Sequence, residues 1–386
     1  MHWLFLCRIP TRRGCGHLDH IPRFQNQLVA YRGGMVSYID LIRKRTQTPW
    51  AIVARGFLRL LAIVFGWIVC FRNRRFDRGA TASQRMSVPV ISVGNLTTGG
   101  TGKTPMVEFI ARYLCEKKIR VTLISRGYGS KKGKPNDEAL ELERKLPTVP
   151  HLQNPDRVAA ARLAIDELDT ELILLDDGFQ HRRIYRDLDI VLIDATCPFG
   201  YGYLLPRGLL REPPANLSRG DVMVVTRVDQ VEPEAVVAID QEIKKHNAQA
   251  PIVHCGHGVD GLDRYNGDRQ PLAALHQKRV LAFCGIGNPT VFHNMLLQQG
   301  LEVVCFEVYQ DHFDFQRSDI QRLLELAQQH QVDAVVCTHK DLVKIQVQSL
   351  GAFELWALAV SLEPQAGAEH LHRALDSVVD TVMKEK

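Results

Sequence analysis

Short apolar runs alternate with stretches of helical period through the middle of the chain. Residues 88–96 form a β-branched run, and residues 104–118 place apolar side chains at the spacing of one helix face. Further apolar runs at 120–129, 171–181 and 189–196 continue this alternation of strand and helix. The pattern predicts an α/β fold with a mainly parallel sheet.

A different apolar pattern precedes this region. Residues 50–71 are long enough for a bilayer span, but Arg55 and Arg59 interrupt them and basic clusters flank them at 43–45 and 72–75. The combination favours a membrane-associating helix over 50–78, lying at the interface with its arginines near anionic headgroups. A single-pass anchor and a buried core helix with a basic face are the competing interpretations.

Charge is distributed unevenly along the 386 residues. The whole chain carries a formal net charge of +5, yet the segment up to Arg85 contains fifteen Lys or Arg against three Asp. We therefore expect a poorly ordered basic N-terminus over 1–49, in which Met35 is an alternative start, and a membrane surface with anionic lipids as partner. Nucleic acid is not an expected partner, because the basic segment lacks interleaved aromatic residues. The nine cysteines contain no C-x-x-C pair, which is typical of a reducing cytoplasm.

A glycine-rich segment, NLTTGGTGKTP at 95–105, connects the first strand to its helix. Backbone N–H groups and a helix N-terminus in this context attract phosphate. Lys103 is expected to reach the β and γ phosphates of a nucleotide, and Thr104 to hold Mg²⁺. Thr97 occupies the position of the usual first glycine, but the final Gly-Lys-Thr makes the main contacts. The expected nucleotide-binding residues are Thr97, Thr98, Gly99, Gly100, Thr101, Gly102, Lys103 and Thr104.

Polar residues follow two further strands at the edge where ligands bind in open α/β sheets. Arg126 and Tyr128 follow the strand at 120–129. Asp176 and Asp177 end the strand at 171–181, in the position of a Walker B carboxylate that holds Mg²⁺. Capping of the next helix is the alternative role for these two acids.

Further apolar runs predict a second, smaller α/β unit. They lie at 251–256, 279–287, 301–308 and 333–340. We expect a P-loop kinase domain over 79–225, a smaller domain over 226–355 that closes the cleft, and a C-terminal helical segment over 356–386 that packs back.

Eight segments together resemble one family, tetraacyldisaccharide 4'-kinase of Gram-negative bacteria, over about residues 50 to 350. They are SVGNLTTGGTGKTP, SRGYG, NDEA, DDGFQH, LLPRGLLREP, CGIGNPTVF, DHFDF and THKDLVK. The resemblance implies an ATP- and Mg²⁺-dependent kinase on the cytoplasmic face of the inner membrane, with no obligate protein partner. Its acceptor would be the 4'-hydroxyl of a tetraacylated glucosamine disaccharide 1-phosphate.

The resemblance also implies roles for individual residues. Asp137 in NDEA and His312 in DHFDF would form a dyad that takes the proton of the acceptor hydroxyl. Ala139 stands where the family usually has proline, which leaves Asp156 as an alternative carboxylate. Positions that would hold Mg²⁺ and the phosphates are Asp176, Asp177, Gln180 and His181, and those that would line the same cleft are Arg126, Tyr128, Arg157, Arg211 and Glu212.

A membrane-recruited regulatory NTPase is the main rival interpretation. The segment TRVD at 226–229 resembles the guanine-reading motif of GTPases, and a basic amphipathic helix would suit such a switch. However, Thr98 stands where partitioning ATPases have a lysine, and DDGFQH is not a switch motif.

Overall fold

The computed structural model describes residues 38–43, 47–127, 137–311 and 313–384. Its P-loop half contains six strands that pair only in parallel, in the spatial order β6-β5-β1-β4-β2-β3. They are β1 (Val90–Asn95), β2 (Val121–Ser125), β3 (His151–Gln153), β4 (Leu172–Asp176), β5 (Leu188–Asp194) and β6 (Val222–Thr226). The predicted mainly parallel α/β sheet is confirmed.

Helices cover both faces of these strands, which explains why the strands are apolar throughout instead of alternating with polar residues. The helices are α3 (Lys103–Glu116), α4 (Asp137–Lys145), α5 (Arg157–Glu167), α6 (Pro233–His246) and α10 (Ala368–Lys384). In β1, Ile91 packs in a core cluster with α3, α4 and α10, whereas its neighbour Val90 packs against α5. In β5, Val191 faces α6.

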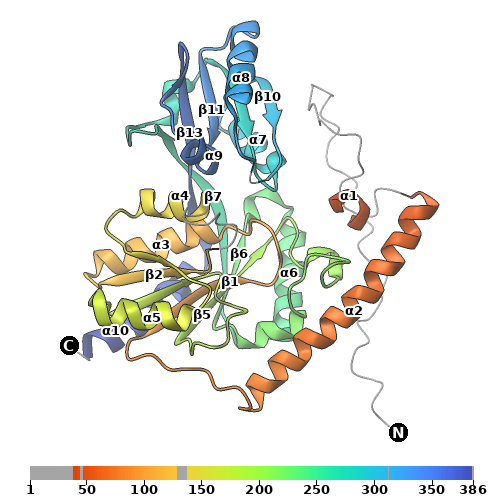
Figure 1. Cartoon of the computed structure of the whole chain (residues 1–386), viewed down its shortest axis with the longest axis vertical. Helices are drawn as coiled ribbons and strands as arrows, with labels where there is room; N and C mark the ends of the chain where they lie inside the picture. Colours follow the sequence, from red (N-terminus) through yellow and green to blue (C-terminus); the bar gives the residue numbers. More distant parts are fainter. Residues whose placement is uncertain (1–37, 44–46, 128–136, 312, 385–386) are drawn as a thin grey trace.

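A smaller half, here called the cap half, extends from the P-loop half (Figure 1). Two long antiparallel strands, β7 (Ile252–Asp263) and β13 (Phe353–Ala366), run through both halves and make one continuous sheet. The remaining elements of the cap half are β8 (Arg269–Gln270), β9 (Arg279–Cys284), α7 (Pro289–Gln298), β10 (Glu302–Val308), α8 (Arg317–Gln329), β11 (Ala334–Thr338), α9 (His339–Ile345) and β12 (Ser349–Leu350). Short 3-10 helices cover Gly200–Gly202, Pro214–Arg219, Val228–Gln230 and Leu272–Leu275.

The boundaries of the two halves differ from the predicted 226 and 356. Ile239 and Ile243 of α6 pack in the same cluster as β5 and β6, so this helix belongs to the P-loop half. The segment from 356 begins as strand β13, and only α10 returns to pack on the P-loop half. Because β7 and β13 cross between the halves, a boundary in sequence cannot coincide with the boundary in space.

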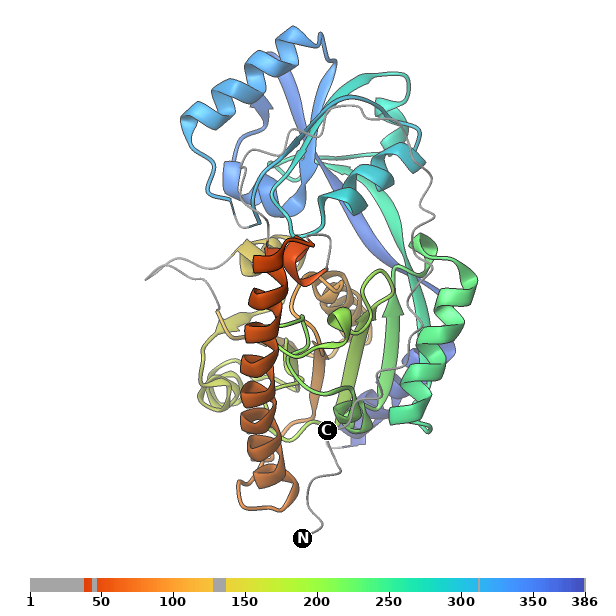
Figure 2. The same ribbon diagram turned by 90° about the vertical axis from the view of Figure 1, so that its right-hand side faces the viewer.

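The predicted N-terminal helix is present as α2 (Pro49–Asp77), and a short helix α1 (Tyr38–Ile42) precedes it. Figure 2 shows α2 along the outside of the P-loop half. By length and composition alone, α2 could cross a membrane. Only 17% of its most apolar window is buried against the rest of the protein. Large apolar side chains such as Val53, Trp67 and Phe71 are exposed, so α2 is not a core helix. The prediction for residues 1–37 lies outside the described residues.

Candidate active site

The glycine-rich loop joins β1 to α3 at the carboxyl edge of the sheet. Gly99 and Gly102 have φ values of 114° and 84°, a region that glycine adopts without a steric penalty. A β-carbon at Gly99 or Gly100 would meet no atom within 4 Å, so the loop has an open side. Lys103 and Thr104 occupy the first turn of α3, where N–H groups and the helix dipole favour an anion.

Buried side chains hold this loop from below. Asn95 donates from Nδ2 to Thr101 Oγ1 at 2.8 Å, and Thr226 donates from Oγ1 to the Thr101 carbonyl at 3.0 Å. Gln180 donates from Nε2 to the Asn95 carbonyl at 2.8 Å. Sequence reasoning did not single out Asn95 or Thr226 for this role, although both end strands at the edge where the loop lies. These contacts fix the loop before a ligand arrives.

Three charged side chains meet beside the loop. Arg211 binds the Asp177 carboxylate in a bidentate manner, with both N···O distances at 2.8 Å, and Lys103 Nζ lies 3.6 Å from Asp177 Oδ1. Burial raises the pKa of Asp177, but the charges of Lys103 and Arg211 outweigh it and hold this pKa well below its usual range. Asp177 is therefore an anion at neutral pH, next to the lysine expected to contact phosphates.

Arg211 also belongs to a segment that flanks the loop. Thr98 N donates to the Leu209 carbonyl at 2.8 Å, and Arg211 N donates to the Leu96 carbonyl at 2.7 Å. The Arg211 side chain donates from Nε to the Thr97 carbonyl at 3.0 Å and also contacts the Asn95 side-chain oxygen. The segment and the glycine-rich loop thus form one hydrogen-bonded unit.

Arg157 and His181 lie on the β4 side of this unit. Arg157 is buried, and its Nη1 donates to the Asp177 carbonyl at 3.0 Å. Burial, followed by the charges of Arg157 and two other arginines, lowers the pKa of His181 to about 4. The His181 imidazole is therefore neutral at pH 7, and it can accept or donate a hydrogen bond without carrying charge.

Only some of the remaining predicted site residues lie within the described part of the chain. Arg126 follows β2 and is exposed. Tyr128 and His312 lie outside the described residues. Asp137 begins α4, and its side chain also lies outside the description. The alternative carboxylate, Asp156, caps α5 by accepting hydrogen bonds from the two backbone amides at positions 158 and 159.

Glu212 is not at the open side of the loop. Its carboxylate has no exposed surface and lies under α2, where Arg72 Nη2 donates at 2.7 Å and Asn73 Nδ2 at 3.2 Å. Asn216 and Arg219 each donate to it at 2.7 Å as well. These contacts attach α2 to the P-loop half.

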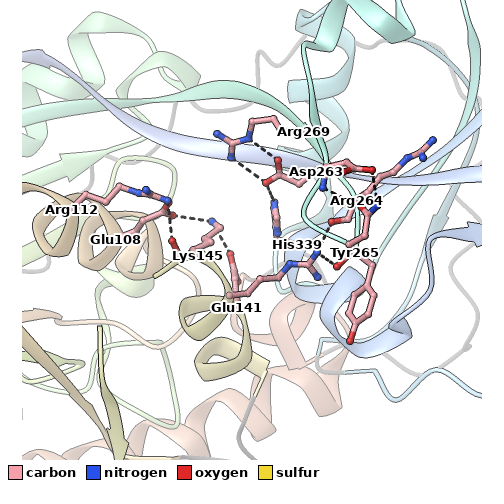
Figure 3. A network of polar contacts seen from close by, with 12 residues as sticks. Glu108, Arg112, Glu141, Lys145, Asp263, Arg264, Tyr265, Arg269 and His339 are labelled. Atoms are coloured by element: carbon pink, nitrogen blue, oxygen red, sulfur yellow. Dashed lines mark hydrogen bonds and ion pairs between the residues drawn. The ribbon is translucent and has the colours of Figure 1, made fainter. Parts of the chain in front are cut away.

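The two halves meet at α4 and the first turn of α9 (Figure 3). Arg144 of α4 donates to the carbonyls of Arg264 and Tyr265, and its guanidinium lies 4.8 Å from the Tyr265 ring centroid. Within the cap half, His339 Nε2 at the start of α9 lies 2.8 Å from Asp263 Oδ2, and α9 packs against α4. The helix that begins with Asp137 is therefore bound to the cap half.

Helix α9 also holds the loop around the predicted histidine at 312. Lys340 Nζ donates to Asp311 Oδ1 at 3.1 Å, and Lys344 Nζ donates to the Phe313 carbonyl at 3.1 Å. Buried Asp341 accepts from Gly285 N in CGIG at 3.1 Å. Three segments that are distant in sequence, CGIG, DHFDF and THKDLVK, therefore meet at one end of the cap half.

The residues around Asp177 fit a magnesium ion. Among the described residues, no three His, Cys, Asp or Glu side chains form a metal-binding group. Magnesium does not need such a group, because it is commonly bound by one or two carboxylates together with water and substrate phosphates. Asp176, Asp177 and Thr104 supply hard oxygen atoms at the ends of β4 and at the start of α3.

Fold and site together define a P-loop α/β protein whose loop, lysine and strand-end acids are arranged for a nucleotide phosphate chain. The family model described as "Tetraacyldisaccharide-1-P 4'-kinase" matches residues 54–380. The chain therefore belongs to this family, and it is a kinase that acts in lipid A biosynthesis.

Individual relatives agree with this membership. The chain is 36% identical over 345 residues to tetraacyldisaccharide 4'-kinase of Geobacter metallireducens, covering 84% of this chain and 98% of that relative. It is 35% identical to the Geobacter sulfurreducens enzyme of the same name, covering 83% and 93%. A crystal structure of LpxK from Aquifex aeolicus in complex with ATP is similar at a TM-score of 0.67 and 29% identity, covering 84% of this chain and 99% of that one.

Neither the contacts of the TRVD residues nor the family membership supports the regulatory GTPase interpretation. Arg227 of TRVD forms an ion pair with Asp194, and Asp229 Oδ1 accepts from the backbone N of His257 at 3.2 Å. Thr226 is fully buried under the glycine-rich loop. These side chains serve the fold of the carboxyl edge.

Proposed function

We propose that this chain transfers the γ-phosphoryl group of ATP to the 4'-hydroxyl of a tetraacylated glucosamine disaccharide 1-phosphate, a lipid A precursor. The observation that carries the proposal is the group of Lys103, Asp177 and Arg211 beside the glycine-rich loop. In this group a lysine is held by an internal carboxylate at the place where a phosphate chain would lie.

The loop amides and the α3 N-terminus would bind the phosphates, with Lys103 bridging the β and γ groups. Phosphoryl transfer depends chiefly on positioning and on neutralising charge at the transferred group. Arg157 and Arg211 supply positive charge within the same hydrogen-bonded unit. Thr104, Asp176 and Asp177 would hold Mg²⁺, which supplies further neutralisation of the phosphate oxygens when it is bound.

The acceptor hydroxyl needs a base. In the proposed step, its oxygen forms a bond to the γ phosphorus while the bond from that phosphorus to the β,γ-bridging oxygen breaks, releasing ADP. The hydroxyl proton passes to His312, which Asp137 would orient. Support comes from the binding of α4 to the cap half and from the contacts of α9 with Asp311 and Phe313.

The acceptor is a lipid, and α2 provides a surface for reaching it. Its exposed face carries large apolar side chains along the whole helix, including Ile52, Leu60 and Ile68. Buried positions occur at Ala51 and then from Ala62 to Asn73, so the P-loop half packs along the C-terminal part of α2 in particular. A spanning helix would carry the P-loop half into hydrocarbon, which favours an α2 that lies in the interface of the inner membrane at its cytoplasmic face.

A lipid-dependent kinase assay tests the function. Purified full-length protein in detergent should convert ATP to ADP only when the acylated disaccharide 1-phosphate is supplied, with equimolar phosphorylated lipid as product. Substitution of Lys103 by Met should abolish product formation. Steady GTP hydrolysis without lipid would instead support a regulatory NTPase and refute the proposal.

A further inference from the structure

One dipeptide contacts both the membrane-facing helix and the nucleotide site. Arg211 directs its side chain to Asp177, Asn95 and the Thr97 carbonyl. The next residue, Glu212, directs its side chain to Arg72 and Asn73 of α2. No other residue is needed to connect the two regions, because the link is a single peptide bond.

The Glu212 end of this link is fully buried. Its carboxylate is in contact with four donors, two from α2 and two from the 3-10 helix that follows, at 2.7 to 3.2 Å. A buried carboxylate that loses a charged donor is costly, because desolvation has already removed its water. Displacing α2 from the P-loop half would therefore expose or strand this charge, and Glu212 would move to recover partners.

Movement of Glu212 would be transmitted to the loop. Arg211 N is bonded to the Leu96 carbonyl at 2.7 Å, and the preceding residues bond to Thr98 and bridge to Thr97. Leu204, in the same segment, also packs on α2, where its side chain leaves no room for a β-carbon at Gly66. The segment 204–212 thus contacts α2 at two points and the glycine-rich loop at three.

We infer that Glu212 is a positioning residue that couples the seating of α2 to the arrangement of the ATP site. When α2 is seated, Arg211 and the glycine-rich loop are held in place. By linkage, nucleotide binding and α2 seating favour each other by the same factor. Because a lipid surface holds α2, a membrane would then act as an activator of nucleotide binding. This last step rests on the proposed membrane docking of α2.

The test compares two arginines at the same end of α2. Arg72→Gln removes the donor to Glu212, whereas Arg75→Gln removes an exposed charge whose side chain has no described contact with the P-loop half. Each variant removes one positive formal charge from the same end of α2. The Kd of a non-hydrolysable ATP analogue in detergent should rise about three- to tenfold in Arg72→Gln and stay unchanged in Arg75→Gln. Thermal melting checks that each variant is folded.

A double-mutant cycle separates coupling from a merely structural role. Combined with Arg211→Lys, the Arg72→Gln change should raise the Kd much less than it does alone, because the side-chain bonds that carry the link to Asp177 and Asn95 are already lost. In the wild type, the analogue should also slow hydrogen exchange of the α2 amides, and this effect should vanish in Arg72→Gln. The inference would be overturned if the double variant raised the Kd by the product of the factors found for the two single variants. Equal Kd values in Arg72→Gln and Arg75→Gln would also overturn it.

Membrane docking is tested separately with vesicles containing phosphatidylglycerol. If the wild-type protein does not sediment with the vesicles while only Arg72→Gln raises the Kd, the coupling stands and the lipid step is refuted. If both variants weaken sedimentation equally and neither changes the Kd, the lipid step stands and the coupling is refuted.

Discussion

The carboxylate of Asp177 has two opposed effects on nucleotide binding, which the substitution Asp177→Asn should separate. It is paired with Lys103 and Arg211 in the described structure, so it competes with phosphates for these cations. It is also a predicted ligand of Mg²⁺. Without Mg²⁺ only the competition remains, and with Mg²⁺ the loss of a ligand dominates.

The energy of the competition between Asp177 and the phosphates for Lys103 can be estimated from the distance of 3.6 Å between Lys103 Nζ and Asp177 Oδ1. Coulomb's law gives about 1 kcal/mol at the dielectric constant of water and about 5 kcal/mol at an effective value near 20. The Asp177 side chain is 34% exposed, so solvent screening places the pair toward the lower end, at about 1–2 kcal/mol. Asp177→Asn should therefore tighten Mg²⁺-free ATP binding by about five- to thirtyfold.

Calorimetry of ATP binding in EDTA measures this directly. Steady-state turnover with saturating Mg²⁺ should fall by about a hundredfold in the same variant, since a group that neutralises the phosphates is lost. Asp166→Asn, which removes an exposed charge from α5, is the matched control and should change neither quantity. A weaker Mg²⁺-free affinity in Asp177→Asn would refute the reasoning, because it would mean that Asp177 supports the nucleotide directly.

Further outcomes test the dyad, the neutral histidine and the membrane face. Asp137→Ala and His312→Ala should each lower kcat by about a hundredfold with little change in ATP affinity, and wild-type turnover in both would contradict the dyad. The pKa of His181 is about 4 in the fold, below its unfolded value, so its contribution to stability is complete above pH 6.5 and is lost as the pH falls toward 4. Between pH 7 and pH 5, the free energy of unfolding measured in urea melts should therefore fall by about 2 kcal/mol less in His181→Asn than in the wild type. Equal falls in the two proteins would disprove this. Trp67→Asp on the exposed face of α2 should reduce sedimentation with vesicles, whereas Leu163→Asp, an exposed apolar residue on α5, should not. Equal behaviour of the two would argue against docking through α2.

Domain organisation shows where sequence reasoning reaches its limit. The helix at 104–118 and the strand at 88–96 were predictable because each has a local period of apolar residues, and because Gly94 lies at the end of the strand and Gly102 just before the helix. The half to which α6 belongs and the end of the cap half near residue 356 were not predictable from the sequence. The reason is that β7 and β13 cross between the halves, and the two ends of each strand belong to different cores. A residue's position along the chain does not tell which core its side chain enters.

Within the candidate site the same division holds. Local sequence determined the glycine-rich loop, the lysine at the start of α3 and the acids that end β4, since a strand, a loop and a helix N-terminus must be consecutive to bind phosphate. Only the tertiary structure decided that Arg211 neutralises Asp177 and that Glu212 turns away from the loop to hold α2. These pairs are 34 and 140 residues apart, and they meet because parallel strands bring their carboxyl ends to one edge while α2 packs across the segment between them. The order of strands in space, which no local period contains, set those contacts.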